Sequence, residues 1–229
     1  MSCCIFAQPG KDSEAIQYIS DYLSMKVVNE IPLSGSFIDL RENGLHFTKD
    51  PTNLSNFLHV DFLSGPMGWR LKRSEHETSF KKAIGKNKED ITIFDGTAGL
   101  LSDTIIFLAL GHKVIACEQS KIIFLLVNDA IERAKAELPF LKNLLFLNAK
   151  SETQYKETQN IDIVYLDPMY PEPSKNVLRS GDISTINHIL HIENIDDGGD
   201  TIFFSIKENN FKKIILKRPI KADIIDKNI

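Results

Sequence analysis

The hydrophobic pattern of the chain changes near residue 90. Beyond that point, short apolar runs alternate with longer segments in which apolar residues recur at helical spacing. We expect strands at 91–94, 113–117, 144–147, 161–166 and 213–216. We expect helices at 102–110 and 120–138, and we favour one at 201–210 because it lies between the fourth and fifth strands. Strands that alternate with helices predict a parallel sheet with helices on both faces.

The pattern before residue 90 is different. Helical spacing is found at 12–25, where apolar side chains fall on one face. Other apolar runs are short and bounded by Gly, Pro or Asn, as is typical of strands and hairpins, at 31–35, 41–45 and 57–62. We therefore expect a small α+β N-terminal subdomain at 1–85, followed by an α/β parallel-sheet domain at 86–229.

Composition narrows the class of protein without indicating a function. The chain has 229 residues, of which 42% are hydrophobic and 25% are charged, as is ordinary for a globular protein. No apolar run is long enough to cross a bilayer and the first residues lack the basic flank of a signal peptide, so we expect a cytoplasmic protein. The net charge of −4 does not by itself indicate a nucleic-acid partner, although local basic clusters are present.

A glycine turn at 95–99 follows the first strand of the expected parallel sheet. Ligands bind at the carboxyl ends of such strands, and Gly96 and Gly99 let the backbone approach a ligand closely. Glu118 ends the second strand 19 residues after Gly99, near the spacing (~20 residues) at which an acid reaches ribose hydroxyls. Leu101 stands where a dinucleotide fingerprint needs a further glycine. Asp95 suits a ligand with a cationic centre, such as S-adenosylmethionine (SAM), or it caps the next helix.

A second candidate site follows the fourth strand, at Asp167-Pro168-Met169-Tyr170. An exocyclic amine of a nucleobase is a poor nucleophile, and a carboxylate can accept its hydrogens as positive charge develops. We interpret Asp167 as the amine acceptor, Pro168 as the residue that stiffens the turn, and Tyr170 as a platform on which the base stacks. The alternative is a proline-rich strand exit with a tyrosine in the core.

The three cysteines, Cys3, Cys4 and Cys117, have neither the spacing of a disulfide framework nor that of a zinc site. His188 and His191 could share a helix face, but no further ligand accompanies them, so no metal site is expected. No cysteine is placed to act as the thiolate that methylation of a pyrimidine ring carbon usually needs.

Several stretches of the sequence match a known family. They are 95–100 with Asp103, 111–114 leading to Glu118, 164–171, 214–219 and, upstream, 60–70. Over about residues 36 to 220 the chain resembles the ribosomal RNA small subunit methyltransferase J family. The resemblance implies a class I SAM-dependent methyltransferase, Rossmann-like in fold, that methylates the exocyclic N2 amine of a guanosine in 16S rRNA.

The resemblance also implies SAM as the cofactor and 16S rRNA or the small ribosomal subunit as the partner. The implied cofactor contacts are Ser102, Asp103, Glu118, Gln119, Lys150, Ser151 and Asp167. The chain departs from the family at Leu101-Ser102, where Gly-Arg is usual, and at Gln119, where Arg is usual. The family continues past the Lys-Arg-Pro run at 217–219 into a final pair of strands, so we expect the last strands to be missing.

Segment 65–73 is expected to be a loop that contacts RNA, because an aromatic residue among cations suits single-stranded RNA. A structural loop over the cofactor is the alternative. The residues expected to contact RNA are Trp69, Arg70, Lys72 and Arg73, together with Lys217 and Arg218 near the C-terminus.

Two other functions remain open from the sequence. A SAM-dependent N-methyltransferase could act on another amine, in DNA adenine or protein glutamine, because such enzymes share the Asp-Pro-x-aromatic motif in outline. A catalytically degenerate protein that binds SAM or RNA is the other alternative, in view of Leu101-Ser102 and the missing strands.

Overall fold

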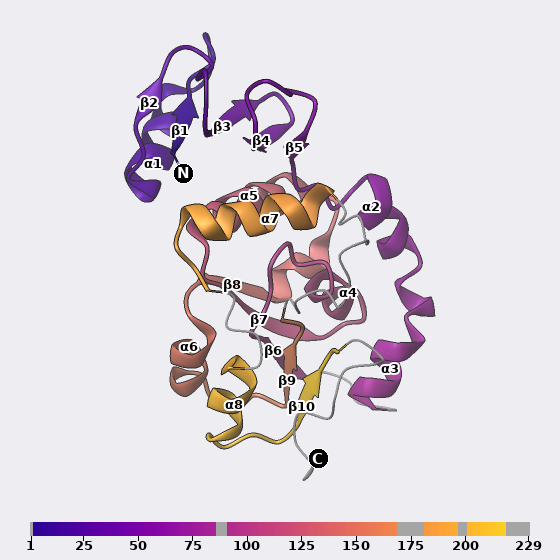
Figure 1. Cartoon of the computed structure of the whole chain (residues 1–229). Helices are drawn as coiled ribbons and strands as arrows, with labels where there is room; N and C mark the ends of the chain where they lie inside the picture. Colours follow the sequence, from indigo (N-terminus) through magenta and orange to yellow (C-terminus); the bar gives the residue numbers. More distant parts are fainter. Residues whose placement is uncertain (1, 86–90, 169–180, 197–200, 219–229) are drawn as a thin grey trace, which may run out of the picture. The chain divides into compact units, whose positions relative to one another are not determined.

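The computed structural model of the chain describes residues 2–85, 91–168, 181–196 and 201–218 (Figure 1). By packing, the chain forms two units. The first contains Met1–Trp69, Ser120–Pro139 and Asn176–Asp196, and the second contains Arg70–Gln119, Phe140–Lys175 and Asp197–Ile229. The first unit thus includes two segments, Ser120–Pro139 and Asn176–Asp196, that come later in the sequence than the start of the second unit. The expected division between residues 85 and 86 stays a prediction.

The first unit is built on a five-stranded mixed sheet with the strand order β2-β1-β3-β4-β5. Its strands are β1 (Cys3–Phe6), β2 (Val27–Val28), β3 (Ser36–Arg41), β4 (Gly44–Thr48) and β5 (Phe57–Leu58). β1 is parallel to β2 and β3, whereas β3, β4 and β5 are antiparallel neighbours. The expected hairpin at 41–45 is the turn between β3 and β4. The prediction of a strand at 31–35 is wrong, because the strand begins only at Ser36.

Three helices belong to the first unit: α1 (Ser13–Leu23), α5 (Lys121–Ala134) and α7 (Gly181–Ile192). α1 confirms the helix expected at 12–25, since the Asp12 side chain caps its N-terminus and Ser24 ends it in the left-handed region at φ 54°. α5 and α7 contact each other, and the Glu193 carboxylate after α7 accepts from Lys121 N at the start of α5. α5 is shorter than the helix expected at 120–138 because turns begin after Ala134.

The second unit contains the expected parallel sheet, with the strand order β10-β9-β6-β7-β8. Its strands are β6 (Thr92–Asp95), β7 (Lys113–Glu118), β8 (Leu144–Asn148), β9 (Ile163–Leu166) and β10 (Ile214–Leu216). The chain runs outward from β6 to β7 and β8, then crosses to the other side of β6 for β9 and β10. Strand order therefore reverses at β6, which is where open parallel sheets bind ligands.

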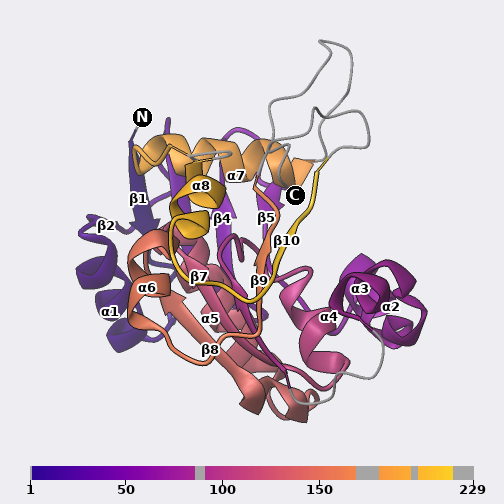
Figure 2. The same cartoon turned by 90° about the horizontal axis from the view of Figure 1, so that it is seen from below.

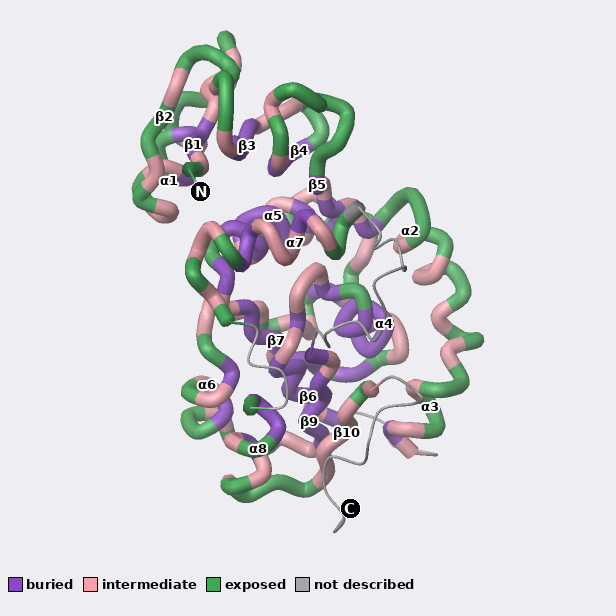
Figure 3. The backbone as a smooth tube through the Cα atoms, viewed as in Figure 1, coloured by how far each residue is buried: buried purple, intermediate pink, exposed green. Residues whose placement is uncertain are grey.

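Helices cover both faces of this sheet (Figure 2). The helices and short 3-10 turns of the unit are α3 (Thr78–Ile84), α4 (Thr104–Ala109), α6 (Ser151–Glu157), α8 (Thr201–Lys207), η1 (Ser74–His76) and η2 (Pro139–Asn143). One face packs Phe94 and Leu166 against side chains of α6 and α8. The alternate residue Tyr165 turns to the other face, where its ring lies 4.9 Å from that of Phe107 on α4. The middle strands are buried (Figure 3), and α8 confirms the favoured helix at 201–210.

The prediction of a loop at 65–73 is wrong, because α2 (Gly65–Lys72) occupies it. Pro66 lies in the first turn of this helix, where its missing N–H costs no intrahelical hydrogen bond. Gly68 packs so closely that a Cβ there would lie 2.5 Å from Leu63 O. Within the described residues, the parallel sheet ends at β10, and none of the helices is long and apolar enough to cross a membrane.

Candidate functional site

The turn after β6 is built around a buried carboxylate. Asp95 is 2% exposed, its Oδ1 accepts from Thr97 N (3.1 Å), and its Oδ2 accepts from the Thr104 hydroxyl. Burial raises the pKa of Asp95 to about 7, and the nearby carboxylates of Asp103 and Asp167 add to the rise. Asp95 thus shapes the turn itself. The N-cap of α4 is Asp103, so Asp95 does not hold the position that its alternative role as a helix cap required.

Backbone hydrogen bonds fix this turn to both neighbouring strands. Gly96 N donates to Tyr165 O of β9 (3.1 Å), and Ala98 N donates to Cys117 O of β7 (3.2 Å). The Ser151 hydroxyl at the start of α6 donates to Gly96 O (2.5 Å). The three contacts hold the turn at the carboxyl ends of β6, β7 and β9, so its backbone is preorganised for a ligand.

The two glycines of the turn have different roles. A Cβ on Gly96 would lie 2.8 Å from the Leu166 side chain and 3.4 Å from Ser151 Cβ, so any larger residue would force the buried Leu166 side chain to move. Gly99 has φ 49°, and among the described residues a Cβ there would meet only Thr97 O, at 4.0 Å. A glycine in this conformation lets a ligand approach the backbone closely.

The end of β7 carries the acid expected to bind a ribose. Glu118 is 8% exposed, and its backbone oxygen accepts from Asn148 Nδ2 (2.8 Å) at the end of β8. Gln119 follows it and is partly exposed, and its oxygen also accepts from Asn148. Lys150 is exposed and N-caps α6. The expected residues after β7 and β8 thus lie at the same edge of the sheet as the glycine turn.

Asp167 follows β9, beside the glycine turn. Its backbone N–H donates to Thr97 Oγ1 (2.6 Å), and its Oδ2 accepts from Lys217 Nζ (2.7 Å). Burial raises the pKa of Asp167, and Lys217 opposes that rise. Pro168 is buried. Tyr170 lies outside the described residues, so its expected stacking role stays a prediction.

Asp103 is the centre of an ion-pair network that the sequence did not suggest. Its Oδ2 accepts from the Tyr165 hydroxyl (2.5 Å) and Lys217 Nζ (3.0 Å), and its Oδ1 accepts from Arg70 Nη1 (2.8 Å). Burial favours the neutral acid, but these donors keep the pKa of Asp103 below its usual value. Arg70 also donates to Ser102 O (2.8 Å). Arg70 and Lys217, both expected to contact RNA, thus form ion pairs with Asp103, which was expected to contact the cofactor.

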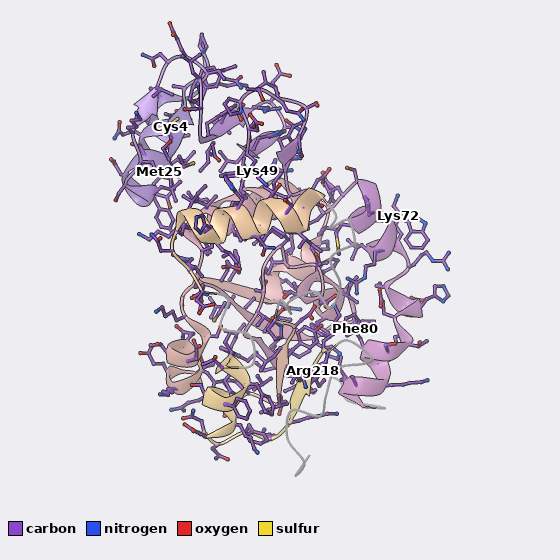
Figure 4. All side chains as sticks on the ribbon, viewed as in Figure 1. Cys4, Met25, Lys49, Lys72, Phe80 and Arg218 are labelled. Carbon is purple, nitrogen blue, oxygen red and sulfur yellow. The ribbon has the colours of Figure 1, made fainter. Side chains whose placement is uncertain are left out.

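An aromatic cluster supports this network from the α4 face of the sheet. Phe80 of α3, labelled in Figure 4, is one member. Its ring lies 4.9 Å from the Phe107 ring and 6.0 Å from the Tyr165 ring. The Arg70 guanidinium lies 5.5 Å from the centre of the Phe80 ring. Tyr165 is the residue that sequence reasoning missed. A hydroxyl in an otherwise aliphatic buried strand is the signal that could have found it.

The other expected RNA contacts are on or near α2. Trp69 is 63% exposed, and Lys72 and Arg73 are exposed as well. Arg218 follows Lys217 after β10 and is partly buried.

Neither thiolate nor metal chemistry has support among the described residues. Burial raises the pKa of Cys117 and of Cys3 to about 12, and it also raises the pKa of Cys4. These thiols are therefore protonated near neutral pH. In the part of the chain that the structure describes, no group of three or more His, Cys, Asp or Glu side chains could hold a metal ion.

The carboxylates at the strand ends suit the chemical groups of SAM. Acids lie at the ends of β7 and β9, namely Glu118 and Asp167, whereas the Asp95 carboxyl group at the end of β6 is engaged by Thr97 N and the Thr104 hydroxyl. Carboxylates suit an ammonium, a sulfonium and ribose hydroxyls, whereas a pyrophosphate would be repelled by them.

Comparison with known proteins agrees with this chemistry. A family model described as "Putative SAM-dependent methyltransferase" matches residues 24–229. Ribosomal RNA small subunit methyltransferase J of Shewanella denitrificans is 33% identical, over 73% of this chain and 69% of that protein. Its counterpart in Francisella philomiragia is 31% identical, over 73% and 72%. The one in Pectobacterium atrosepticum is 29% identical, over 96% and 89%.

A crystal structure supports the fold in the same way. The SAM-dependent methyltransferase of Neisseria gonorrhoeae superposes with a TM-score of 0.69 at 22% identity, covering 97% of this chain and 87% of that one. The parallel sheet and this likeness confirm the expected class I, Rossmann-like methyltransferase fold. With the family match and the relatives above 30% identity, they show that the chain belongs to the SAM-dependent methyltransferases, in the family of ribosomal RNA small subunit methyltransferase J.

Proposed function

We propose that this chain uses SAM to methylate the exocyclic N2 amine of a guanosine in 16S rRNA of the small ribosomal subunit, in the cytoplasm. The names of its relatives support small-subunit ribosomal RNA as the substrate. The observation that carries the proposal is the position of the Asp167 carboxylate. Its carboxylate follows β9 beside the glycine turn, and Pro168 comes directly after it. A carboxylate there suits an amine better than a hydroxyl or a ring carbon as the methyl acceptor.

In this proposal Asp167 acts on the amine. Its carboxylate accepts a hydrogen bond from the amine, which holds the nitrogen lone pair towards the methyl group. When bound, SAM supplies an electrophilic methyl group on a sulfonium. Transfer of that methyl group to the nitrogen would break its bond to sulfur and would leave a neutral thioether. The nitrogen then releases one proton to Asp167 or water, which balances the charge.

The residues that we propose to hold the cofactor are those at the strand ends. Glu118 is proposed to bind the ribose hydroxyls, and the Gly99 backbone to border the ligand. The full proposed set is Asp95, Gly96, Gly99, Ser102, Asp103, Glu118, Gln119, Lys150, Ser151 and Asp167. Within it, we assign Asp95, Asp103 and Ser151 to shaping the site, because Asp95 and Ser151 hydrogen-bond to residues of the glycine turn and Asp103 to Tyr165.

The RNA contacts are proposed on the basic residues and the exposed tryptophan. Trp69, Lys72 and Arg73 are exposed on and after α2, as a contact with unstacked bases and phosphates requires. Arg70 and Arg218 complete the proposed set, whereas Lys217, expected in it from the sequence, pairs with Asp103 and Asp167. Tyr170 is proposed from the sequence as the residue that stacks on the target base.

The test is methyl transfer to RNA of known modification state. Transcribed 16S rRNA carries no modification, so it can be offered naked or assembled with ribosomal proteins, together with methyl-labelled SAM. Digestion to nucleosides should give labelled N2-methylguanosine. Asp167→Ala should lower the rate at least ~100-fold, in line with loss of an electrostatic acceptor. Glu132→Ala, at an exposed ion pair on α5, serves as the control and should keep the wild-type rate.

The alternatives give different products. Label in adenine of DNA or in protein glutamine would replace the RNA proposal with another N-methyltransferase. A wild-type protein that transfers no methyl group to either form of the RNA would overturn it in favour of a degenerate binding protein.

A further inference from the structure

We propose that Lys217 is a positioning residue that orients the Asp167 carboxylate for the target amine. This inference rests on the proposed function, because it assigns a role towards Asp167 in that reaction. The relevant contacts join Lys217 to two carboxylates at the end of the parallel sheet.

The sheet itself fixes where Lys217 lies. β10 runs parallel to β9, with Leu216 opposite Leu166, so the next residues of both strands emerge at the same edge. Lys217 N donates to Leu166 O (2.8 Å), which extends the pairing by one hydrogen bond. Lys217 and Asp167 are therefore neighbours by strand register, although they are 50 residues apart in the sequence.

The ammonium of Lys217 contacts two carboxylates, that of Asp103 and that of Asp167, which we propose to bind the target amine. Its Nζ lies 3.0 Å from Asp103 Oδ2 and 2.7 Å from Asp167 Oδ2. Asp103 is 8% exposed and is also held by Tyr165 and Arg70, so it is the fixed end of the bridge. Among the described residues, no donor contacts Oδ1 of Asp167. Lys217 thus occupies one oxygen of Asp167 and leaves the other for the amine.

Electrostatics give the bridge a second effect. Burial raises the pKa of Asp167 and the Asp103 charge raises it further, whereas Lys217 lowers it. Desolvation lowers the pKa of Lys217, but the two carboxylates raise it more, so the lysine stays charged. A protonated Asp167 would lose acceptor capacity for the amine. Lys217 therefore extends the pH range in which Asp167 is ionised towards lower pH.

The competing role for Lys217 is the phosphate contact expected from the sequence. The two roles predict different measurements. A phosphate contact changes RNA affinity and its dependence on salt, since each neutralised phosphate contributes ~0.7–0.9 to the slope of log K against log salt. A positioning residue changes the ionisation of Asp167 and the turnover number, with RNA affinity unchanged.

The experiment compares Lys217→Met, which keeps the aliphatic stem, with Lys217→Arg, which keeps the charge. Lys212→Met is the matched control, because Lys212 pairs with Asp162 at the opposite end of β9. Lys217→Gln replaces the methionine variant if that variant does not fold. The first readout is the pKa of the Asp167 carboxyl in the free protein, from ¹³C NMR titration assigned with Asp167→Asn. The second is kcat against pH, and the third is RNA affinity against salt.

We expect Lys217→Met to raise the pKa of Asp167 by about one unit, the lower end for loss of an opposite charge at this distance, since Lys217 is half exposed. Because the reaction needs ionised Asp167, the acid limb of kcat should move to higher pH by the same amount. At pH values below the pKa of Asp167, kcat of Lys217→Met should be up to roughly tenfold lower than that of the wild type, and the difference should shrink at high pH. Lys217→Arg should restore most of the activity, and Lys212→Met should change nothing.

An unchanged pKa of Asp167 in Lys217→Met would overturn the proposal, as would a weaker RNA affinity with a smaller salt slope and an unmoved pH profile. The NMR titration needs neither SAM nor RNA. If the wild-type protein fails to methylate guanosine, the proposed function fails, while the titration still decides whether Lys217 controls Asp167.

Discussion

Leu101 shows at the residue scale how burial and backbone strain are balanced in this chain. It adopts φ 60°, in the left-handed region that costs a side chain with a Cβ about 1–2 kcal/mol. Its N–H donates to Ala98 O and its oxygen accepts from Ile105 N, so both neighbouring turns fix the conformation. The side chain is fully buried, and burial of a leucine contributes about 1.5–3 kcal/mol. Burial thus offsets the backbone strain, so a leucine is tolerated at this left-handed position.

Substitutions at Leu101 should therefore reverse the usual order of alanine and glycine. Leu101→Ala should lose roughly 2–4 kcal/mol of unfolding free energy through the cavity, with the strain retained. Leu101→Gly creates the same cavity but relieves the strain, so it should be more stable than Leu101→Ala by about 1 kcal/mol. Urea unfolding of both variants measures this. Leu108 is similarly buried but lies inside α4, so Leu108→Ala should be more stable than Leu108→Gly. If the alanine variant is the more stable one at both positions, the account of Leu101 is contradicted.

At the scale of elements, α2 changes how the proposed RNA contact is built. Trp69 and Lys72 are three residues apart in this helix and share a face, and Arg73 follows directly after it. Such a surface holds its aromatic ring and its cations in a fixed arrangement. Less conformational entropy is lost on binding than with the loop expected from the sequence.

Trp69→Ala should weaken binding of single-stranded RNA about tenfold, because stacking of one base contributes ~1–3 kcal/mol. The fluorescence of this tryptophan, the only one in the chain, should change on titration with RNA and gives the affinity of the wild-type protein. Affinities of the variants are measured by filter binding. Tyr18→Ala on α1 is the control, since Tyr18 is 60% exposed but outside the proposed contact. Equal losses in both variants would count against α2 as the contact.

Two elements that the sequence did not predict were missed for different physical reasons. β1 is a four-residue strand, Cys-Cys-Ile-Phe, whose partners come from 27–28 and 36–39, so only long-range pairing defines it. α6 is seven residues long and mostly polar, so no apolar periodicity marks it. The middle strands of the parallel sheet, β6, β7 and β9, were predictable because they are mostly buried and appear as apolar runs.

At the scale of the whole molecule, the acids at the strand ends could be predicted from the sequence, but the ion pairs around them could not. Asp95, Glu118 and Asp167 follow apolar runs, and the carboxyl ends of parallel strands meet at one edge. The bridge from Asp103 to Lys217 joins residues 114 apart, and it depends on the order of β9 and β10 in the sheet. Likewise, a boundary read along the sequence could not place α5 and α7 with the N-terminal strands.

The central claim is that the edge formed by β6, β7 and β9 binds SAM, and calorimetric titration of the purified protein with SAM tests it most directly. The wild type should bind with a dissociation constant of about 1–100 μM, near the usual range for enzyme substrates. Glu118→Ala should weaken binding at least ~10-fold through loss of a charged hydrogen bond to the ribose, whereas Glu132→Ala should bind like the wild type. Absence of binding by the wild type at millimolar SAM, or equal affinity in all three proteins, would contradict the account.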